Sequence, residues 1–293
     1  MSVLAISKTL AGAANGVAWR PQGDLIAVAH ATTPFLTVIR TSDGEVDTGW
    51  PTLASTGNGV AWSPDGSRLA VAHANSGGTA LTVIDASAKT VESDWPGLNS
   101  DRFGVAWHPD GSRLAVVGAS AGAENPRLAV INTATQAIDT GWATLSGTGN
   151  GVAWSPDGSR LAAAYANSPR LAVIDTATGL VESGWPVLAG NGWGVGWSPN
   201  GSRLAVAHEI TPFFTVIDTN TQEAEGGWPM LPFNGRGVAW HPDGSRLAVA
   251  HESGSGLSVF TTVDKAPETG WSAPGGNGGG VAFAWDPGNC CSG

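Results

Sequence analysis

Short apolar runs separated by turn residues recur along the whole chain. In residues 151–193 the order is GVAW, a Ser-Pro-Asp-Gly-Ser-Arg segment, LAAAYA, LAVID, and a last run ending at a Gly-Trp pair. These runs alternate or stay continuously apolar, with no helical period, so they predict buried β-strands. Pro presets φ in a tight turn and Gly accepts positive φ, so Pro-Asp-Gly predicts a reversal. Each unit should therefore hold three or four antiparallel strands.

The units form a repeat array marked by tryptophan. The tetrapeptide Gly-Val-Ala-Trp, once with Gly for Ala, recurs at steps of 43 to 47 residues and ends at Trp19, Trp62, Trp107, Trp154, Trp197 and Trp240. A second series follows a Gly or Asp and comprises Trp50, Trp95, Trp142, Trp185, Trp228 and Trp271. A four-stranded unit of this length, repeated six or more times, is typical of a β-propeller blade.

Blade packing explains why tryptophan recurs. Adjacent blades pack face to face, and a large flat apolar side chain fills the space between them. At roughly 25 cal/mol per Å² and ~200 Å² per indole, each could contribute ~5 kcal/mol gross. We therefore interpret the periodic tryptophans as structural rather than as ligand-binding residues.

The string Trp-Ser-Pro-Asp-Gly-Ser-Arg-Leu-Ala, at 62–70 and 154–162 with variants in other units, resembles the WD-repeat-like β-propellers of the bacterial TolB type. The resemblance covers nearly the whole chain and implies the fold. Its relatives include scaffolds, translocation accessories, sensors and, in tailed phages, virion structural proteins. No unit pairs an early Gly-His with a terminal Trp-Asp in register, so the His/Asp tetrad of eukaryotic WD repeats is not expected here.

The expected fold is all-β, with one β-propeller domain over residues 1–293 built from four-stranded antiparallel blades. The predicted repeats are 16–58, 59–103, 104–150, 151–193, 194–236 and 237–279. Residues 280–293 and 1–15 would together form a closing seventh blade, with an outer strand at 3–7 and an inner one at 281–285. Clasping both chain ends in one blade would remove a free sheet edge. Six blades with spare terminal strands is the alternative.

Charge and composition exclude several partners. The formal net charge is −10, which disfavours phosphate backbones and anionic lipid surfaces, so neither nucleic acid nor membrane insertion is expected. No secretory signal is recognisable, which predicts a cytoplasmic or virion-associated protein. The only cysteines, Cys290 and Cys291, can build neither a disulfide framework nor a four-thiolate zinc site, and they suggest no role.

Positions that break the repeat are the candidate binding residues. The residue before each Gly-Val should rim the central channel, and the set is Asn15, Asn58, Phe103, Asn150, Trp193, Arg236 and Gly279. Phe103, Trp193 and Arg236 depart from the common asparagine, and aromatic residues with arginine are typical of protein-binding hot spots. Loop packing is the alternative explanation. The loops after the second strand add further candidates at Phe35, Phe213 and Phe214, with the same alternative.

A second ring of candidates ends the second strands and comprises His30, His73, Gly118, Tyr165, His208 and His251. We expect these histidines to hydrogen-bond a neighbouring loop, with a pH-sensitive partner contact as an alternative. No metal is expected, because equivalent atoms of neighbouring blades lie far apart whereas zinc requires nitrogens within ~2.1 Å. Each Arg of the turn motif, such as Arg68, should pair weakly with the Asp three residues earlier.

Three motifs of catalytic or ion-binding sites are missing from the sequence. It contains no His-Glu-x-x-His, no Walker loop and no calcium-binding loop. We therefore predict no catalytic residues, no cofactor and no enzymatic activity. The preferred function is a scaffold that assembles with other proteins, as a homo-oligomer, in a virion or in another large complex. A glycan or small-ligand binder using the channel-mouth residues is the alternative, and a hydrolase with an unrecognised site is the second.

Overall fold

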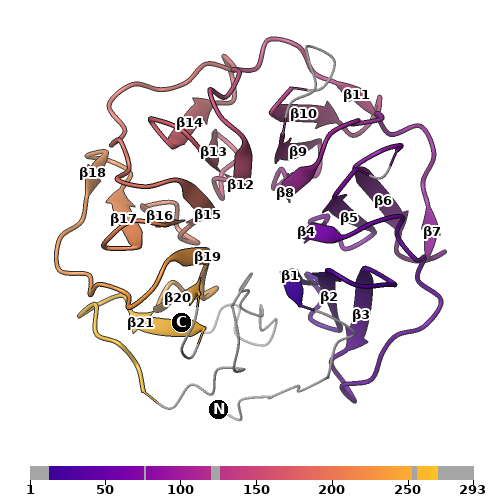
Figure 1. Cartoon of the computed structure of the whole chain (residues 1–293), viewed down its shortest axis with the longest axis horizontal. Coiled ribbons are helices and arrows are strands. Elements are labelled where there is room, and N and C mark those ends of the chain that lie inside the picture. The colour runs from indigo at the N-terminus through magenta and orange to yellow at the C-terminus, as the bar shows by residue number, and fades with distance from the viewer. Residues whose placement is uncertain (1–12, 76, 120–125, 253–255, 270–293) are drawn as a thin grey trace, which may run out of the picture.

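The chain forms a ring of β-sheets around a central channel (Figure 1). The computed structural model describes residues 13–75, 77–119, 126–252 and 256–269. Within these ranges it contains 21 strands in six antiparallel sheets and no helix. The prediction of an all-β propeller is confirmed. The expected closing blade, 280–293 with 1–15, falls almost entirely outside the described residues, so the choice between six and seven blades stays a prediction.

Every sheet starts at the channel and proceeds outward, one strand after the next. The innermost strands are β1 (Ala14–Trp19), β4 (Gly57–Trp62), β8 (Arg102–Trp107), β12 (Gly149–Trp154), β15 (Gly192–Trp197) and β19 (Gly235–Trp240). The second strands are β2 (Leu25–His30), β5 (Arg68–His73), β9 (Arg113–Gly118), β13 (Arg160–Tyr165), β16 (Arg203–His208) and β20 (Arg246–His251). The third strands are β3 (Leu36–Arg40), β6 (Leu81–Asp85), β10 (Leu128–Asn132), β14 (Leu171–Asp175), β17 (Phe214–Asp218) and β21 (Leu257–Thr261).

The fourth, outermost strand is short. Three sheets carry two-residue strands, β7 (Thr90–Val91), β11 (Ala137–Ile138) and β18 (Glu223–Ala224). In the other three, the fourth strand is reduced to a single bridge, made by Val46, Val181 and Pro267. Short outer strands leave few unpaired backbone groups on the edge of a blade, which limits pairing with other chains.

The first tryptophan series closes the seams between blades. Trp62, Trp107, Trp154, Trp197 and Trp240 are buried, with 7 to 8% of their surface exposed. Each indole Nε1 donates a hydrogen bond across the seam, as from Trp154 to the carbonyl of Ala106 at 3.1 Å. The same bond recurs at the other four seams between 2.9 and 3.2 Å. The seam indoles therefore contribute both apolar burial and a directional bond to the previous blade.

The antiparallel order gives the ring two different faces. The first strand of each blade is joined to the second by the Pro-Asp-Gly turn, or Pro-Gln-Gly and Pro-Asn-Gly in two blades, and we call this side the turn face. The loop face is the opposite side, which carries the loops from second to third strands and the connections that enter each innermost strand. Loops on these faces differ between blades while the strands repeat.

Candidate functional site

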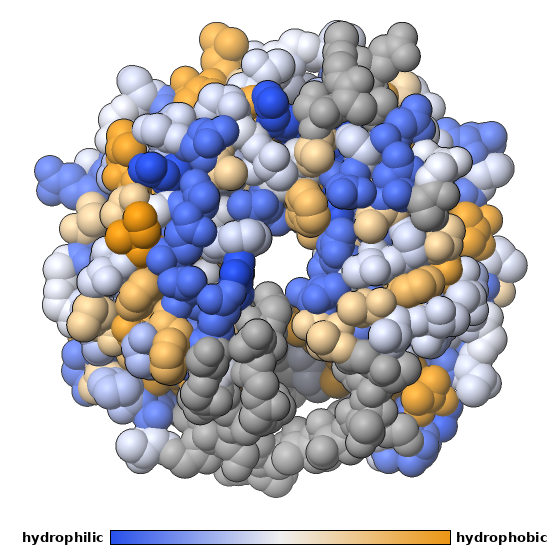
Figure 2. Space-filling view, in the orientation of Figure 1, coloured by the Kyte–Doolittle hydropathy of each residue, from blue (hydrophilic) through white to orange (hydrophobic). Residues whose placement is uncertain are grey.

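The six predicted rim residues within the described ranges surround one opening on the loop face. Asn15, Asn58, Phe103, Asn150, Trp193 and Arg236 line a cavity of about 180 Å³ at the channel. Figure 2 shows the channel as an open hole with hydrophilic and hydrophobic side chains next to each other around it. A role for these residues in binding stays a prediction.

A β-bulge sets the direction of each rim side chain. The pairing of β1 with β2 skips Asn15, since Ala14 pairs with His30 and Gly16 with Ala29. The same shift occurs at the start of the other five innermost strands. Bulges bend a strand and re-aim one side chain. The repeat therefore presents one side chain per blade to the opening, whatever residue stands there.

Three asparagines bridge neighbouring blades at this opening. The Nδ2 of Asn15 donates to the carbonyl of Gly57 at 2.9 Å, and Asn58 and Asn150 make the same bond to the next blade at 2.8 and 2.7 Å. The glycine after each rim residue allows this approach, since a Cβ on Gly151 would lie 2.4 Å from the carbonyl oxygen of Trp193. Phe103, Trp193 and Arg236 have side chains that cannot repeat the amide bridge.

Trp193 and Arg236, which stand where other blades have asparagine or phenylalanine, contact each other. The guanidinium carbon of Arg236 lies 3.9 Å from the ring centroid of Trp193, within the range of a cation–π interaction. Arg236 also pairs with Glu252, which accepts a 2.9 Å hydrogen bond from Asn234. Burial lowers the pKa of Arg236, and the negative charge of Glu209 acts in the opposite direction by raising it. Blade 5 (β15–β18) and blade 6 (β19–β21) therefore present a half-buried aromatic and ionic cluster where blades 1, 2 and 4 present asparagine.

The histidines lie elsewhere than predicted. His30, His73, His208 and His251 are at most 1% exposed and do not line the opening, which corrects their assignment to the channel mouth. Each Nε2 hydrogen-bonds a hydroxyl of the third strand in its own blade, as between His73 and Thr82 at 2.9 Å. Burial lowers the pKa of His30, His73 and His208. The imidazoles therefore serve as hydrogen-bonding residues inside the blades.

Blades 3 and 4 replace this histidine in different ways. Tyr165 is 3% exposed and so is also absent from the opening. In blade 3 the position is Gly118, and Arg102, which pairs with it across the strands, is fully buried. Its Nη1 donates to the carbonyl of Pro126 at 2.6 Å, and burial lowers its pKa to about 10. A Cβ on Gly118 would lie 3.0 Å from Cδ of Arg102, so the arginine side chain packs directly against this glycine.

The aromatic loop candidates pack inward. Phe214 belongs to β17, is 2% exposed and stacks on Phe260 at 5.3 Å, so its prediction as a loop-binding residue is wrong. Phe35 and Phe213 are half-buried and contact the cores of the seams that follow blades 1 and 5. Side chains alternate between the two faces of a strand, and Phe214, the first residue of β17, lies on the face that packs in the core.

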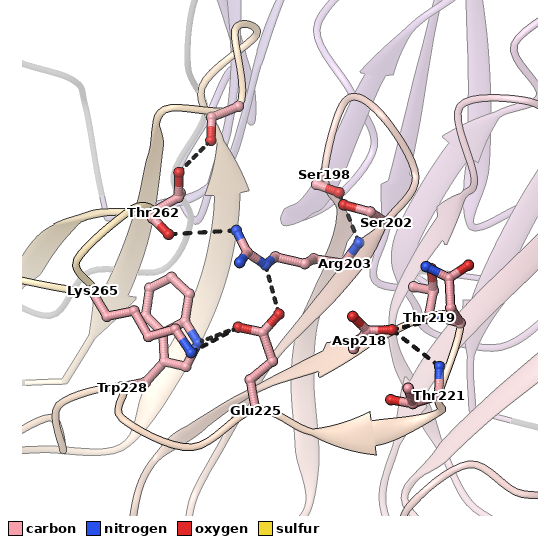
Figure 3. Close-up of polar contacts among 12 residues, drawn as sticks. Ser198, Ser202, Arg203, Asp218, Thr219, Thr221, Glu225, Trp228, Thr262 and Lys265 are labelled. Carbon is pink, nitrogen blue, oxygen red and sulfur yellow. Dashed lines mark hydrogen bonds and ion pairs between the residues drawn. The ribbon is translucent and has the colours of Figure 1, made fainter.

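The turn arginines pair with residues that sequence proximity did not indicate. Asp65 instead accepts hydrogen bonds from Ser63 and Ser67, the first of which is the main reason that its pKa falls to about 2. Arg68 pairs with Glu92 at 2.7 Å. The same arrangement recurs in blade 5, where Arg203 meets Glu225 at 2.6 Å, as Figure 3 shows. The partner comes from the outer edge of the same blade, 22 to 26 residues later.

The sequence interpretation missed a group of exposed apolar side chains on the loop face. We define the apolar loop patch as Val187, Ile210, Met230 and Phe233, which are 63, 48, 63 and 40% exposed. Val187 and Met230 each stand two residues after a tryptophan of the second series. The equivalent residues in other blades are Thr52, Gly97 and Thr144. Ile210 stands two residues after the end of its second strand, and the equivalent residues in other blades are Thr32, Asn75 and Asn167. Comparing loop positions between repeats would have revealed the patch.

The patch adjoins the aromatic and ionic cluster. Val187 lies in the connection that enters β15, and Met230 and Phe233 lie in the one that enters β19, so both connections lead directly to Trp193 and Arg236. The loop carrying Ile210 contacts both, since a Cβ on Gly190 would lie 2.7 Å from the backbone nitrogen of Ile210, and Leu231 donates to the carbonyl of Pro212 at 3.3 Å. The residues that differ from the repeat therefore lie together on blades 5 and 6 and on the connections that enter them.

The described residues suggest neither a metal centre nor a membrane-spanning helix. They contain no group of three or more His, Cys, Asp or Glu side chains that could hold a metal ion. Within the same residues, no helix has the length and apolar character needed to cross a bilayer.

Comparison with known proteins supports the fold. The family model of the anaphase-promoting complex subunit 4 WD40 domain matches residues 17–100. A structure titled Crystal Structure of Mitotic Checkpoint Complex contains a chain with a TM-score of 0.75 and 19% identity, covering 92% of this chain and 82% of that one. Hydrazine synthase from Kuenenia stuttgartiensis has a TM-score of 0.71 and 20% identity, covering 87% and 78%. No curated protein matches the sequence. The repeats, the ring of sheets and these solved structures show a β-propeller fold, and residues 17–100 are similar to the WD40 family.

Proposed function

We propose that this propeller is a non-enzymatic scaffold that binds another protein across the loop face of blades 5 and 6. The observation that carries the proposal is the concentration of repeat-breaking residues there. The apolar loop patch, Trp193 and Arg236 stand where the other blades have threonine, asparagine, serine or glycine, with Phe103 in blade 3 as the exception. Exposed apolar residues next to an aromatic residue and an arginine are the usual composition of the centre of a protein interface.

Charge refines the expected partner. Glu209 and Glu252 flank the patch and are each half-buried, and Arg236 is already paired with Glu252. A partner segment that combines apolar and basic residues complements this surface better than an acidic one. Membership of a virion or another large complex is a finer version of the same proposal.

The glycan alternative finds less support in the site geometry. Sugar binding requires a free aromatic face, and Arg236 covers one face of the Trp193 ring at 3.9 Å. Phe103 lines the same opening but lies in blade 3, with the innermost strand of blade 4 between it and Trp193.

Paired substitutions test the proposal. The double variant Ile210→Asp with Met230→Asp places charge in the patch, and Thr32→Asp with Thr52→Asp places it at the matched positions of blades 1 and 2. Affinity purification from the organism of origin, quantified by mass spectrometry, should lose at least tenfold of a defined partner with the first variant and keep it with the second. Equal recovery with both variants would reject the proposed face. Binding on a glycan array that Trp193→Ala abolishes would support the alternative function instead.

A further inference from the structure

Two seams on the turn face contain a lysine whose ammonium group sits in a small built site. Lys89 lies in the turn before β7 of blade 2 and reaches back to blade 1. Its Nζ contacts Asp47 Oδ2 at 2.8 Å and the carbonyl of Thr48 at 2.8 Å, and lies 5.7 Å from the ring centroid of Trp50. Carboxylate, carbonyl and indole face therefore surround one primary ammonium group.

The seam between blades 5 and 6 repeats the site with different residues. Lys265 Nζ contacts Glu225 Oε2 at 3.0 Å and the carbonyl of Gly226 at 2.7 Å, and lies 5.6 Å from the ring centroid of Trp228. Figure 3 shows Lys265 beside Trp228 and Glu225. In both seams the carboxylate and carbonyl precede the tryptophan by three and two residues, so the chain uses one local motif to hold an ammonium group.

The seam between blades 3 and 4 has the motif without the lysine. Asp139, Thr140 and Trp142 occupy the three motif positions, and the residue equivalent to Lys89 and Lys265 is Gly179. All three have positive φ, so the turn itself is the same. A cavity of about 330 Å³ lies at this seam, lined by Arg113, Asp139, Thr140, Trp142 and the opposing turn 176–179. The Gly179 backbone packs close to the preceding blade, since a Cβ on Gly179 would lie 2.5 Å from the carbonyl oxygen of Gly141.

Charge pairing at this seam also differs from that at the two lysine-bearing seams. Asp47 meets both Arg40 and Lys89, and Glu225 meets both Arg203 and Lys265. The ion pair of Asp139 is with Arg113 at 3.0 Å, and the guanidinium carbon of Arg113 is 6.0 Å from the Trp142 ring. Asp139 thus pairs with one cation, as Glu92 and Glu182 do in blades 2 and 4, whereas the two carboxylates at the lysine-bearing seams pair with two.

We propose that the cavity between blades 3 and 4 binds a primary alkylammonium group, held by the Asp139 carboxylate, the Thr140 carbonyl and the Trp142 ring. The donor is the lysine side chain of a partner protein or a free amine of the same chemistry. The site lies on the turn face and does not depend on the proposed interface of the loop face. Its ligand atoms are those that hold the internal lysines in the two counterpart seams.

Nuclear magnetic resonance of the tryptophan indole N–H groups can test this site. The folded chain is titrated with Nα-acetyl-lysine methylamide, and the norleucine analogue serves as the uncharged control. The expected result is a saturable shift of the Trp142 signal with lysine only, and at least fivefold weaker binding in Asp139→Asn, which keeps the side-chain shape. A Trp142 signal that does not move, or moves equally in Asp139→Asn, would overturn the proposal.

A gain-of-site variant keeps the test independent of folding defects. Lys265→Gly should open the counterpart cavity and make the Trp228 signal respond to the lysine derivative, whereas no response is expected in the parent chain, where Lys265 occupies the site. An unresponsive Trp228 signal in the folded variant would contradict the assignment of the motif. Propylammonium separates the two sources: tighter binding of the lysine derivative assigns a protein partner, whereas equal binding assigns a free amine.

Discussion

The blade seams and the channel mouth are built from the same repeat but tolerate change differently. At the seams, five indoles occupy equivalent places and each donates to the carbonyl of the previous blade. At the mouth, the backbone bulge recurs while the side chain varies among asparagine, phenylalanine, tryptophan and arginine. A buried position is constrained by every neighbour it contacts, whereas a bulged residue at an opening is constrained mainly by its backbone.

The largest expected effect comes from removing a seam indole. Trp154→Ala leaves a cavity between blades 3 and 4 and breaks the bond to Ala106, so the free energy of unfolding should fall by about 3 to 5 kcal/mol. Denaturant unfolding followed by circular dichroism measures the change. Trp193→Ala at the mouth is the control, with an expected loss below about 2 kcal/mol. Similar losses for both variants would remove the distinction between the two regions.

The buried histidines predict a pH dependence that belongs to the blades rather than to the mouth. Burial lowers the folded-state pKa of His73 and His208 below the ordinary value of 6.5, so the unfolded chain binds more protons in mildly acidic solution. Their contribution to stability is therefore complete above pH 6.5 and is lost as the pH falls toward the folded-state pKa. The slope is at most about 1.4 kcal/mol per pH unit for each imidazole.

Thermal unfolding at pH 7.5, 6.5 and 5.5 measures this slope. The double variant His73→Gln with His208→Gln keeps polar side chains next to Thr82 and Thr215 but removes the two titrating groups. Its loss of stability between pH 7.5 and 5.5 should be smaller than that of the parent chain. An unchanged slope would show that other groups dominate acid sensitivity.

The smallest effect concerns the asparagine bridges. Asn58→Ala removes the 2.8 Å bond to the carbonyl of Arg102 and should cost about 1 kcal/mol of unfolding free energy. Phe103→Asn should add the missing bridge to blade 4 and raise stability by a few tenths of a kcal/mol up to about 1. Chemical denaturation of both variants compares them directly. A destabilising Phe103→Asn would indicate that the phenyl ring packs better at the mouth than the bridge would.

Repetition explains which features of the site were predictable. The spacing of Gly-Val-Ala-Trp predicted both the blade strands and the positions that line the channel opening, because equivalent residues occupy equivalent places in a propeller. The histidines end their strands on the loop face as predicted, but their side chains are buried because each imidazole bonds a third-strand hydroxyl inside its own blade. Arg68 was assigned to Asp65 because local proximity favoured it, yet the serine hydroxyls already occupy that carboxylate.

The sequence by itself determined the strand pattern, the repeat and the seam residues, because burying an alternating apolar face leaves few choices of fold. Only the tertiary structure decided which variable positions meet. Val187, Ile210 and Met230 are separated by 20 residues or more, and their neighbourhood arises from the packing of blade 4 on blade 5 and blade 5 on blade 6. The cavity beside Trp142 likewise exists because a turn of one blade reaches the edge of the previous one. Contacts between blades depend on the angle at which the sheets pack, and no local pattern of residues encodes that angle.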